Sequence, residues 1–261
     1  MGALLGVGAN QLWVEDTGGP GVPLVLLHPG ITDSSIWDRL LPLLGGRRIV
    51  RFDRPGSGQS PTSTGTDRPV DHLAGVLDAL ALERVHLVGN SNGGGTSLGL
   101  ATTQPERVAS LTLLCPAVPG FPWPDDAGDA EIEAEYERLT QVKDLGGLSD
   151  LYARVFLAQG ADDYLRAQVR ATTELELSGD DVGQRNPEVW EAADRITAPT
   201  TVVIGELDDP DTTLAATELA GRVPEAELVR LDVDHVPQYR DPEAVAEAVL
   251  RTVARTVARA D

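Results

Sequence analysis

Three short segments carry side chains that could do chemistry together. Residues 89–93 read Gly-Asn-Ser-Asn-Gly, a G-x-S-x-G pattern that places Ser91 between two glycines. Asp208 and His235 lie far downstream in the chain. A serine hydroxyl becomes an effective nucleophile when a histidine takes its proton and a carboxylate orients that histidine. The three side chains would therefore support attack on a carbonyl carbon if the fold brings them together.

Each of the three residues follows a stretch of strand type. An apolar run at 85–88 precedes the serine, and runs at 200–205 and 227–231 precede the aspartate and the histidine. The carboxyl ends of parallel strands open on one edge of a sheet, where ligands bind. We therefore expect the three side chains to converge at that edge. The glycines around Ser91 suit a sharp strand-to-helix turn in which a Cβ would clash.

Strands and helices alternate along the first part of the chain. Short apolar runs indicate strands, and apolar positions at helical spacing indicate helices. We expect strands at 10–17, 23–27, 48–52 and 108–114, and helices at 36–44 and 69–82. Such alternation is typical of a parallel sheet with right-handed crossovers.

The alternation stops at about residue 117 and resumes at about 198. The segment between them shows acidic helical stretches with scattered aromatic residues and no clear strand. We therefore predict an α/β core formed by residues 1–117 and 198–261, and a helical cap, or lid, at 118–197. Helices at 212–221 and 241–260 would complete the core.

Four motifs resemble those of a known superfamily. They are LLHPG at 26–30, DRPGSGQS at 53–60, GNSNGG at 89–94, and GELD at 205–208 together with DH at 234–235. The chain resembles the α/β-hydrolase fold superfamily over nearly its whole length, and within it the capped serine hydrolases of the carboxylesterase and 3-oxoadipate enol-lactonase type. The order Ser, Asp, His is the order of that superfamily. The resemblance implies a mostly parallel central sheet flanked by helices, with a helical cap insertion.

The same resemblance assigns roles to the site residues. Ser91 would be the nucleophile, Asp208 the acid and His235 the base. The backbone N–H groups of Gly30 and Asn92 would form the oxyanion hole. Asp209, one position further on, is the alternative acid.

One position departs from the pattern of the superfamily. Pro29 stands where a glycine is usual, and proline has no N–H. The oxyanion donor is expected to be the next residue, so the hole should be retained.

Further residues are candidates to line a substrate pocket. They are His28, Ile31, Trp123, Tyr136, Phe156, Trp190 and Val236. The cap aromatics could equally pack the core of the cap itself, and His28 fits a role in shaping its loop. His72, at a helix start, is expected to be exposed.

Composition limits the partners. The 261 residues carry a formal net charge of -20, which argues against nucleic acid and anionic membranes. The chain shows neither an apolar span long enough for a bilayer nor a basic N-terminal signal region, so we expect a cytoplasmic protein. The single cysteine, Cys115, excludes an intramolecular disulfide and is expected to be a buried hydrophobe. We expect no cofactor, no metal, a small-molecule partner, and a monomer or homodimer.

These observations predict a serine hydrolase. It would cleave a small to medium organic ester or lactone through an acyl-enzyme intermediate. Hydrolysis of a C–C bond and cofactor-free perhydrolysis use the same triad and stay open. Serine at the nucleophile position disfavours haloalkane dehalogenase and epoxide hydrolase chemistry. A ligand receptor without hydrolytic activity on the same fold is the alternative from another class, because fold does not fix function.

Overall fold

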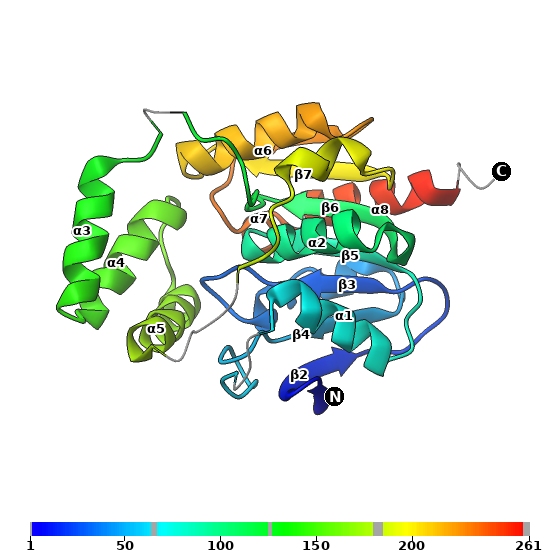
Figure 1. The fold of residues 1–261 in the computed structure, drawn as a ribbon, viewed down its shortest axis with the longest axis horizontal. Helices are drawn as coiled ribbons and strands as arrows, with labels where there is room; N and C mark the ends of the chain where they lie inside the picture. The colour runs from blue at the N-terminus through cyan, green and yellow to red at the C-terminus, as the bar shows by residue number, and fades with distance from the viewer. Residues whose placement is uncertain (1, 64–66, 125–126, 180–184, 258–261) are drawn as a thin grey trace.

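A mostly parallel sheet of eight strands forms the centre of the molecule (Figure 1). The computed structural model describes residues 2–63, 67–124, 127–179 and 185–257. The strands are β1 Ala3–Val7, β2 Asn10–Asp16, β3 Leu24–Leu27, β4 Ile49–Phe52, β5 Val85–Asn90, β6 Val108–Leu114, β7 Thr200–Gly205 and β8 Glu227–Leu231. Their order in the sheet is β1-β2-β4-β3-β5-β6-β7-β8.

Most neighbouring strands are parallel. The pairs β1–β2 and β2–β4 are antiparallel, and the pairs from β4 through β3 to β8 are parallel. Strands β3, β5, β6 and β7 are buried at every position. Continuous apolar runs of this kind suit parallel strands that are covered on both faces.

Helices cover both faces of the sheet. One hydrophobic cluster joins α1 Pro69–Ala79, α2 Asn92–Thr103 and α6 Pro210–Arg222 to the strands. A second cluster joins α8 Pro242–Val257 to the strands together with two short 3-10 helices, η1 Ser34–Trp37 and η2 Leu41–Leu44. Two packed layers hold the sheet rigid, so its carboxyl edge is a fixed platform.

Three helices between β6 and β7 project from this platform (Figure 1, left). They are α3 Ala130–Gln141, α4 Leu145–Phe156 and α5 Asp163–Ser178. Leu139, Leu148 and Leu151 form a small separate core between them. Helix α5 also packs on the main domain through Leu165 and Val169. A fourth element, η4 Trp190–Arg195, packs against the first cluster of the core.

The short elements η3 Pro105–Arg107 and α7 Pro237–Arg240 were not expected from the sequence, and two further differences have a physical cause. The segment 36–44 forms the two 3-10 helices and not one α-helix, because Pro42 removes a donor within it. The short edge strand β1 was not expected, and its residues are mostly exposed. Within the described residues, no helix combines the length and the apolar character needed to cross a membrane.

Candidate active site

Ser91 lies in a strained turn between β5 and α2. Its backbone has φ 52° and ψ -117°, a combination that L residues rarely adopt. The turn is tight, since a Cβ on Gly89 would lie 2.4 Å from the Gly93 carbonyl oxygen and one on Gly93 would lie 2.2 Å from that of Leu27. The motif therefore requires glycine at both positions. It holds the serine at the carboxyl end of the central strand.

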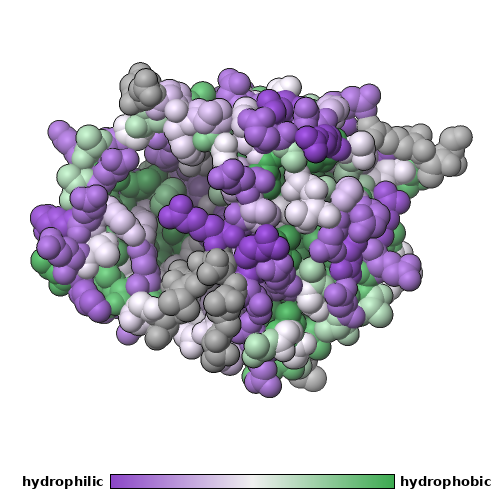
Figure 2. Space-filling model, in the orientation of Figure 1, coloured by the Kyte–Doolittle hydropathy of each residue, from purple (hydrophilic) through white to green (hydrophobic). Residues whose placement is uncertain are grey.

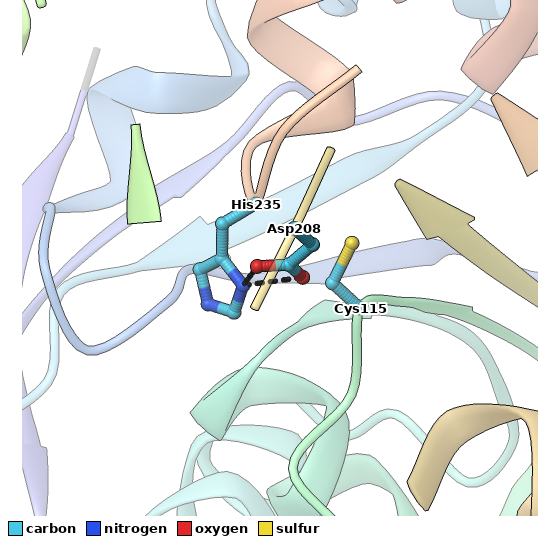
Figure 3. Close-up of side chains that lie close together, drawn as sticks. All are labelled: Cys115, Asp208 and His235. Atoms are coloured by element: carbon cyan, nitrogen blue, oxygen red, sulfur yellow. Dashed lines mark hydrogen bonds and ion pairs between the residues drawn. The ribbon is translucent and has the colours of Figure 1, made fainter. Parts of the chain in front are cut away.

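His235 and Asp208 form a buried pair at the same edge (Figure 3). His235 Nδ1 lies 2.9 Å from Asp208 Oδ1 and 2.8 Å from Oδ2. The two side chains are 3% and 1% exposed. The N–H of Asp209 donates to Asp208 Oδ1 at 2.8 Å and fixes the carboxylate. A carboxylate only accepts, so Nδ1 carries the proton and Nε2 is left with the lone pair.

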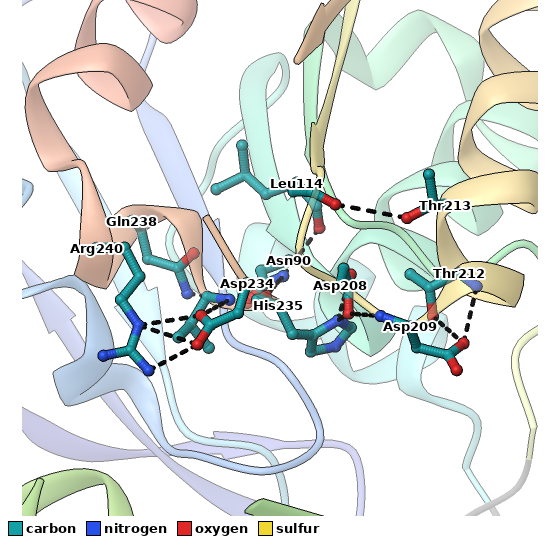
Figure 4. A network of polar contacts seen from close by, with 12 residues as sticks. Asn90, Leu114, Asp208, Asp209, Thr212, Thr213, Asp234, His235, Gln238 and Arg240 are labelled. Carbon is teal, nitrogen blue, oxygen red and sulfur yellow. Dashed lines mark hydrogen bonds and ion pairs between the residues drawn. The ribbon is translucent and has the colours of Figure 1, made fainter. Parts of the chain in front are cut away.

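Asp209 has a different partner. Its carboxylate accepts from the N–H of Thr212 at 3.0 Å and from the Thr212 hydroxyl at 3.3 Å (Figure 4). It is thus the N-cap of α6. The structure directs Asp208, and not this alternative acid, toward the histidine.

A buried amide joins the serine turn to the histidine loop. Asn90 Nδ2 donates to the carbonyl oxygens of Leu114, at 2.9 Å, and His235, at 3.0 Å. Gln238 Nε2 donates to Asn90 Oδ1 at 2.9 Å (Figure 4). No hydrogen bond between Ser91 Oγ and His235 occurs in the described structure. Asn90 was not singled out from the sequence, although a polar residue at the end of an apolar strand was the available signal.

The loop after β3 lies against the start of α2. A Cβ on Gly30 would lie 3.7 Å from Asn92 Nδ2, so the two residues proposed for the oxyanion hole are neighbours. Arg54 donates to the Gly30 carbonyl oxygen at 3.1 Å. This contact helps to hold the loop in place.

His28 shapes the same loop. Its Nε2 accepts from the backbone N–H of Arg54 at 3.1 Å, so its Nδ1 carries the proton and donates to the Pro29 carbonyl oxygen at 2.8 Å. Burial, aided by the charge of Arg54, lowers the pKa of His28 to about 3. Both nitrogens are occupied and the ring stays neutral, which leaves no nitrogen free to act as a second base.

The end of helix α4 contacts the histidine. The His235 N–H donates to the Phe156 carbonyl oxygen at 3.3 Å, and the two rings lie 4.7 Å apart. The fully buried Asp234 accepts from Gln159 N–H at 3.1 Å and pairs with Arg240 at 2.7 Å. The segment after α4 is thus bound to the loop that carries the base.

Cys115 lies beside the buried pair (Figure 3). Ligand atoms of Cys115, Asp208 and His235 all lie within 4.8 Å of one another. Burial, with a contribution from Asp208, raises the pKa of the Cys115 thiol well above its usual value, so the sulfur stays protonated. Its position directly after β6, at the same sheet edge, was the signal that the sequence offered for this proximity.

The residues expected to line a pocket do not all lie together. Phe156 lies at the histidine, while Ile31 and Val236 are buried in the neighbouring loops. Trp190 packs edge-on against Phe121 and its carbonyl accepts from Arg222, so it belongs to the core packing.

The remaining two predicted aromatics are on the surface. Trp123 is 51% exposed and borders a cavity that Asn92 also lines. Tyr136 donates to Glu176 within the projecting helices. The prediction that His72 is exposed was wrong. The side chain is buried and contacts Asn10. Figure 2 shows a hollow between the projecting helices and the sheet, with hydrophobic residues in its depth.

Comparison with known proteins gives the family. Residues 24–248 match the model of the alpha/beta hydrolase family. The match covers most of the chain, including all three candidate catalytic residues and the projecting helices. The chain therefore belongs to the alpha/beta hydrolase family.

Three individual proteins show how similar the chain is to known members of the family. The chain is 44% identical over 112 residues to a 2-hydroxymuconate semialdehyde hydrolase of Pseudomonas sp. (strain CF600), a match that spans only 40% of either protein. It is 31% identical over 222 residues, 76% of this chain and 74% of the relative, to a 2-hydroxy-6-oxononadienedioate/2-hydroxy-6-oxononatrienedioate hydrolase of Cupriavidus pinatubonensis. Among solved structures, Est816, described as an N-acyl homoserine lactone degrading enzyme, has a TM-score of 0.78 and 26% identity, covering 95% of this chain and 99% of that one.

Proposed function

We propose that the protein is a serine hydrolase that attacks the carbonyl carbon of a small to medium ester or lactone with Ser91. The observation that supports the proposal most is the buried His235–Asp208 pair, 2.8 Å apart, at the sheet edge where the strained Ser91 turn lies. Such a turn with a histidine and a buried carboxylate at the same edge is the arrangement that activates a serine. The lactone-degrading activity named for Est816 supports the choice of a lactone.

The proposed reaction uses the lone pair on His235 Nε2. It accepts the proton of Ser91 Oγ as the oxygen attacks, and the N–H groups of Gly30 and Asn92 stabilise the oxyanion. His235 then protonates the leaving group and activates water to release the acyl group. The Ser91–His235 hydrogen bond would form when substrate binds, as is common for sites without ligand.

Hydrolysis of a C–C bond is the second candidate, and the names of the relatives favour it. Both curated relatives described above are named as hydrolases of oxo-dienoate or semialdehyde compounds. The same three residues would then expel a stabilised carbanion in place of an alkoxide.

The nucleophile is tested by reaction with a fluorophosphonate. We expect one covalent adduct by intact-protein mass on the wild type and none on Ser91→Ala, because only an activated serine reacts. Failure of folded wild-type protein to react would contradict the proposal and would favour a non-hydrolytic receptor. Thermal stabilisation by a ligand would then support the receptor.

The bond that is cleaved is tested with a substrate panel. p-Nitrophenyl esters and simple lactones represent the first candidate, and 2-hydroxy-6-oxo-hexadienoates represent the second. A kcat/KM higher for the dienoates by about 100-fold or more, which is about 2.7 kcal/mol, would select C–C hydrolysis. The reverse order would select ester or lactone hydrolysis.

A further inference from the structure

The backbone of His235 is held from two sides. Its carbonyl oxygen accepts from Asn90 Nδ2 at 3.0 Å, and its N–H donates to the Phe156 carbonyl oxygen at 3.3 Å, at the end of α4. The second bond is longer than the usual N–H···O distance of about 2.9–3.0 Å, so it does not fix the chain alone. The position of the imidazole therefore depends on other contacts that hold the segment 156–160 against the histidine loop, residues 232–236.

Asp234, the residue before the base, supplies such contacts. Its side chain is fully buried. Its Oδ2 accepts from the Gln159 N–H at 3.1 Å, and its own N–H donates to Gln159 Oε1 at 3.2 Å. Each residue is thus donor and acceptor to the other, which fixes both the distance and the orientation between the two segments.

Arg240 closes this junction from the short helix α7. Its Nε donates to Asp234 Oδ1 at 3.0 Å, and its Nη2 donates to Oδ2 at 2.7 Å (Figure 4). The same Nη2 donates to the carbonyl oxygen of Gly160, the residue after Gln159. Loss of one partner of a buried ion pair leaves an uncompensated buried charge. The members of the junction therefore stabilise one another.

Other contacts attach the projecting helices at a different place. Gln168 of α5 accepts from the Asp33 N–H at 2.8 Å and donates to Asp33 Oδ2 at 3.1 Å. A hydrogen bond of 2.9 Å joins the hydroxyl groups of Tyr164 and Ser35. These contacts reach the loop after β3, so α5 stays attached without Asp234. Loss of the Asp234 contacts should accordingly release the segment 156–160 and the histidine loop while α5 stays in place.

We propose that Asp234 is a positioning residue for the base. It transmits the docking of the segment 156–160 to His235, so that the imidazole is held in position to reach Ser91 while this segment is docked. The inference rests on the proposed serine hydrolase function, in which His235 is the base. It adds a residue that acts through the histidine without touching the substrate.

Asp234→Asn tests the proposal with little change of shape. An asparagine has one acceptor oxygen, so its NH₂ group would face either the Gln159 N–H or the Arg240 guanidinium, and two donors do not pair. We expect the rate of fluorophosphonate labelling of Ser91, and kcat for the best substrate of the panel, to fall about 10- to 100-fold. KM should stay within about twofold, because the surface that binds the substrate is unchanged.

Tyr164→Phe is the matched control. It removes the hydrogen bond to Ser35 between the projecting helices and the core, and it keeps the ring stacked on Tyr239 at 5.4 Å. Its labelling rate should equal that of the wild type. An equal loss in both variants would show a general need for attached helices, and an unchanged rate in Asp234→Asn would show no role in positioning. Either result would overturn the proposal.

Gln159→Ala serves as a second variant in case Asp234→Asn does not fold. Gln159 is exposed, and its replacement keeps the buried pair of Asp234 and Arg240 while it removes the acceptor of the Asp234 N–H. A labelling rate about threefold or more below that of the wild type is expected, since a bond next to the base is lost. A wild-type rate in this variant would contradict the proposal.

Hydrogen exchange measured by mass spectrometry separates failure of the positioning role from failure of the proposed function. In Asp234→Asn, peptides that cover 156–160 and 232–238 should exchange about tenfold faster or more, while peptides of α5 keep the wild-type rate. This result supports the coupling of the two segments even if the wild type does not react with the fluorophosphonate. Unchanged exchange at the histidine loop, or faster exchange throughout the projecting helices, rejects the coupling and leaves the Ser91 assignment to be judged by labelling of the wild type.

Discussion

Replacement of Asp208 by asparagine tests the site most directly. The N–H of Asp209 donates to Oδ1 of residue 208 at 2.8 Å, so the amide oxygen of an asparagine would keep that position. The NH₂ group would then occupy the place of Oδ2, 2.8 Å from His235 Nδ1. Two donors cannot face each other, so the proton of the imidazole moves to Nε2. That nitrogen can then no longer accept the proton of Ser91.

The expected loss is large because the wrong tautomer removes the base without removing the side chain. Asp208→Asn should lower kcat by about 10⁴-fold, or about 5 kcal/mol of transition-state stabilisation, with little change in KM. The assay is steady-state hydrolysis of whichever ester or lactone the panel identifies. The rate of fluorophosphonate labelling should fall in parallel.

Asp209→Asn is the matched control one residue away. Asparagine caps a helix about as well as aspartate does, so α6 should keep its N-terminus and activity should change little. Circular dichroism and thermal unfolding would show that both variants are folded. Loss of a general base lowers kcat by much more than about tenfold. If kcat of Asp208→Asn stays within about tenfold of the wild-type value, the tautomer argument is wrong.

Two further predictions concern stability. Gly93→Ala should lower the free energy of unfolding by about 3 kcal/mol or more, or prevent folding, because its Cβ would lie 2.2 Å from the Leu27 carbonyl oxygen. Gly221→Ala in α6 should raise the free energy of unfolding by about 0.5–1 kcal/mol, because the space around it is open. Urea unfolding followed by circular dichroism measures both, and equal effects would refute the steric argument. His28 has a folded pKa of about 3 against an ordinary 6.5, so the unfolded chain takes up the proton first and about 3 kcal/mol of stability should be lost as pH falls from 7 to 4. His28→Gln should show a smaller loss over that range, and an unchanged slope would contradict the assigned pKa.

The central strands could be predicted from the sequence because burial on both faces leaves a continuous apolar run. The strand expected at 108–114 forms as predicted, as do those at 200–205 and 227–231. Strand β1 could not be predicted in this way, because it is an edge strand whose residues are mostly exposed. At 36–44 the helical spacing of the apolar residues was present, but Pro42 prevented a continuous α-helix.

The candidate site was also predictable only in part. Chain order and motifs were enough to nominate Ser91, Asp208 and His235, since residues that follow parallel strands share one edge. Which aspartate faces the imidazole could not be read from a one-residue offset, because it depends on the cap of α6. The position of Trp190 depends on how the segment after the projecting helices returns to the sheet, and spacing along the chain carries no such information.

The attachment of the projecting helices has a consequence for domain grafting. The end of α4 and the segment after it are not a free connector, because Phe156 and Gln159 hydrogen-bond to the loop of His235 and Asp234. An insertion exchanged between family members at this point would remove the hydrogen bonds that Phe156 and Gln159 make to the histidine loop. A chimaera should therefore transfer 156–160 together with its partners on the histidine loop, or leave both in place.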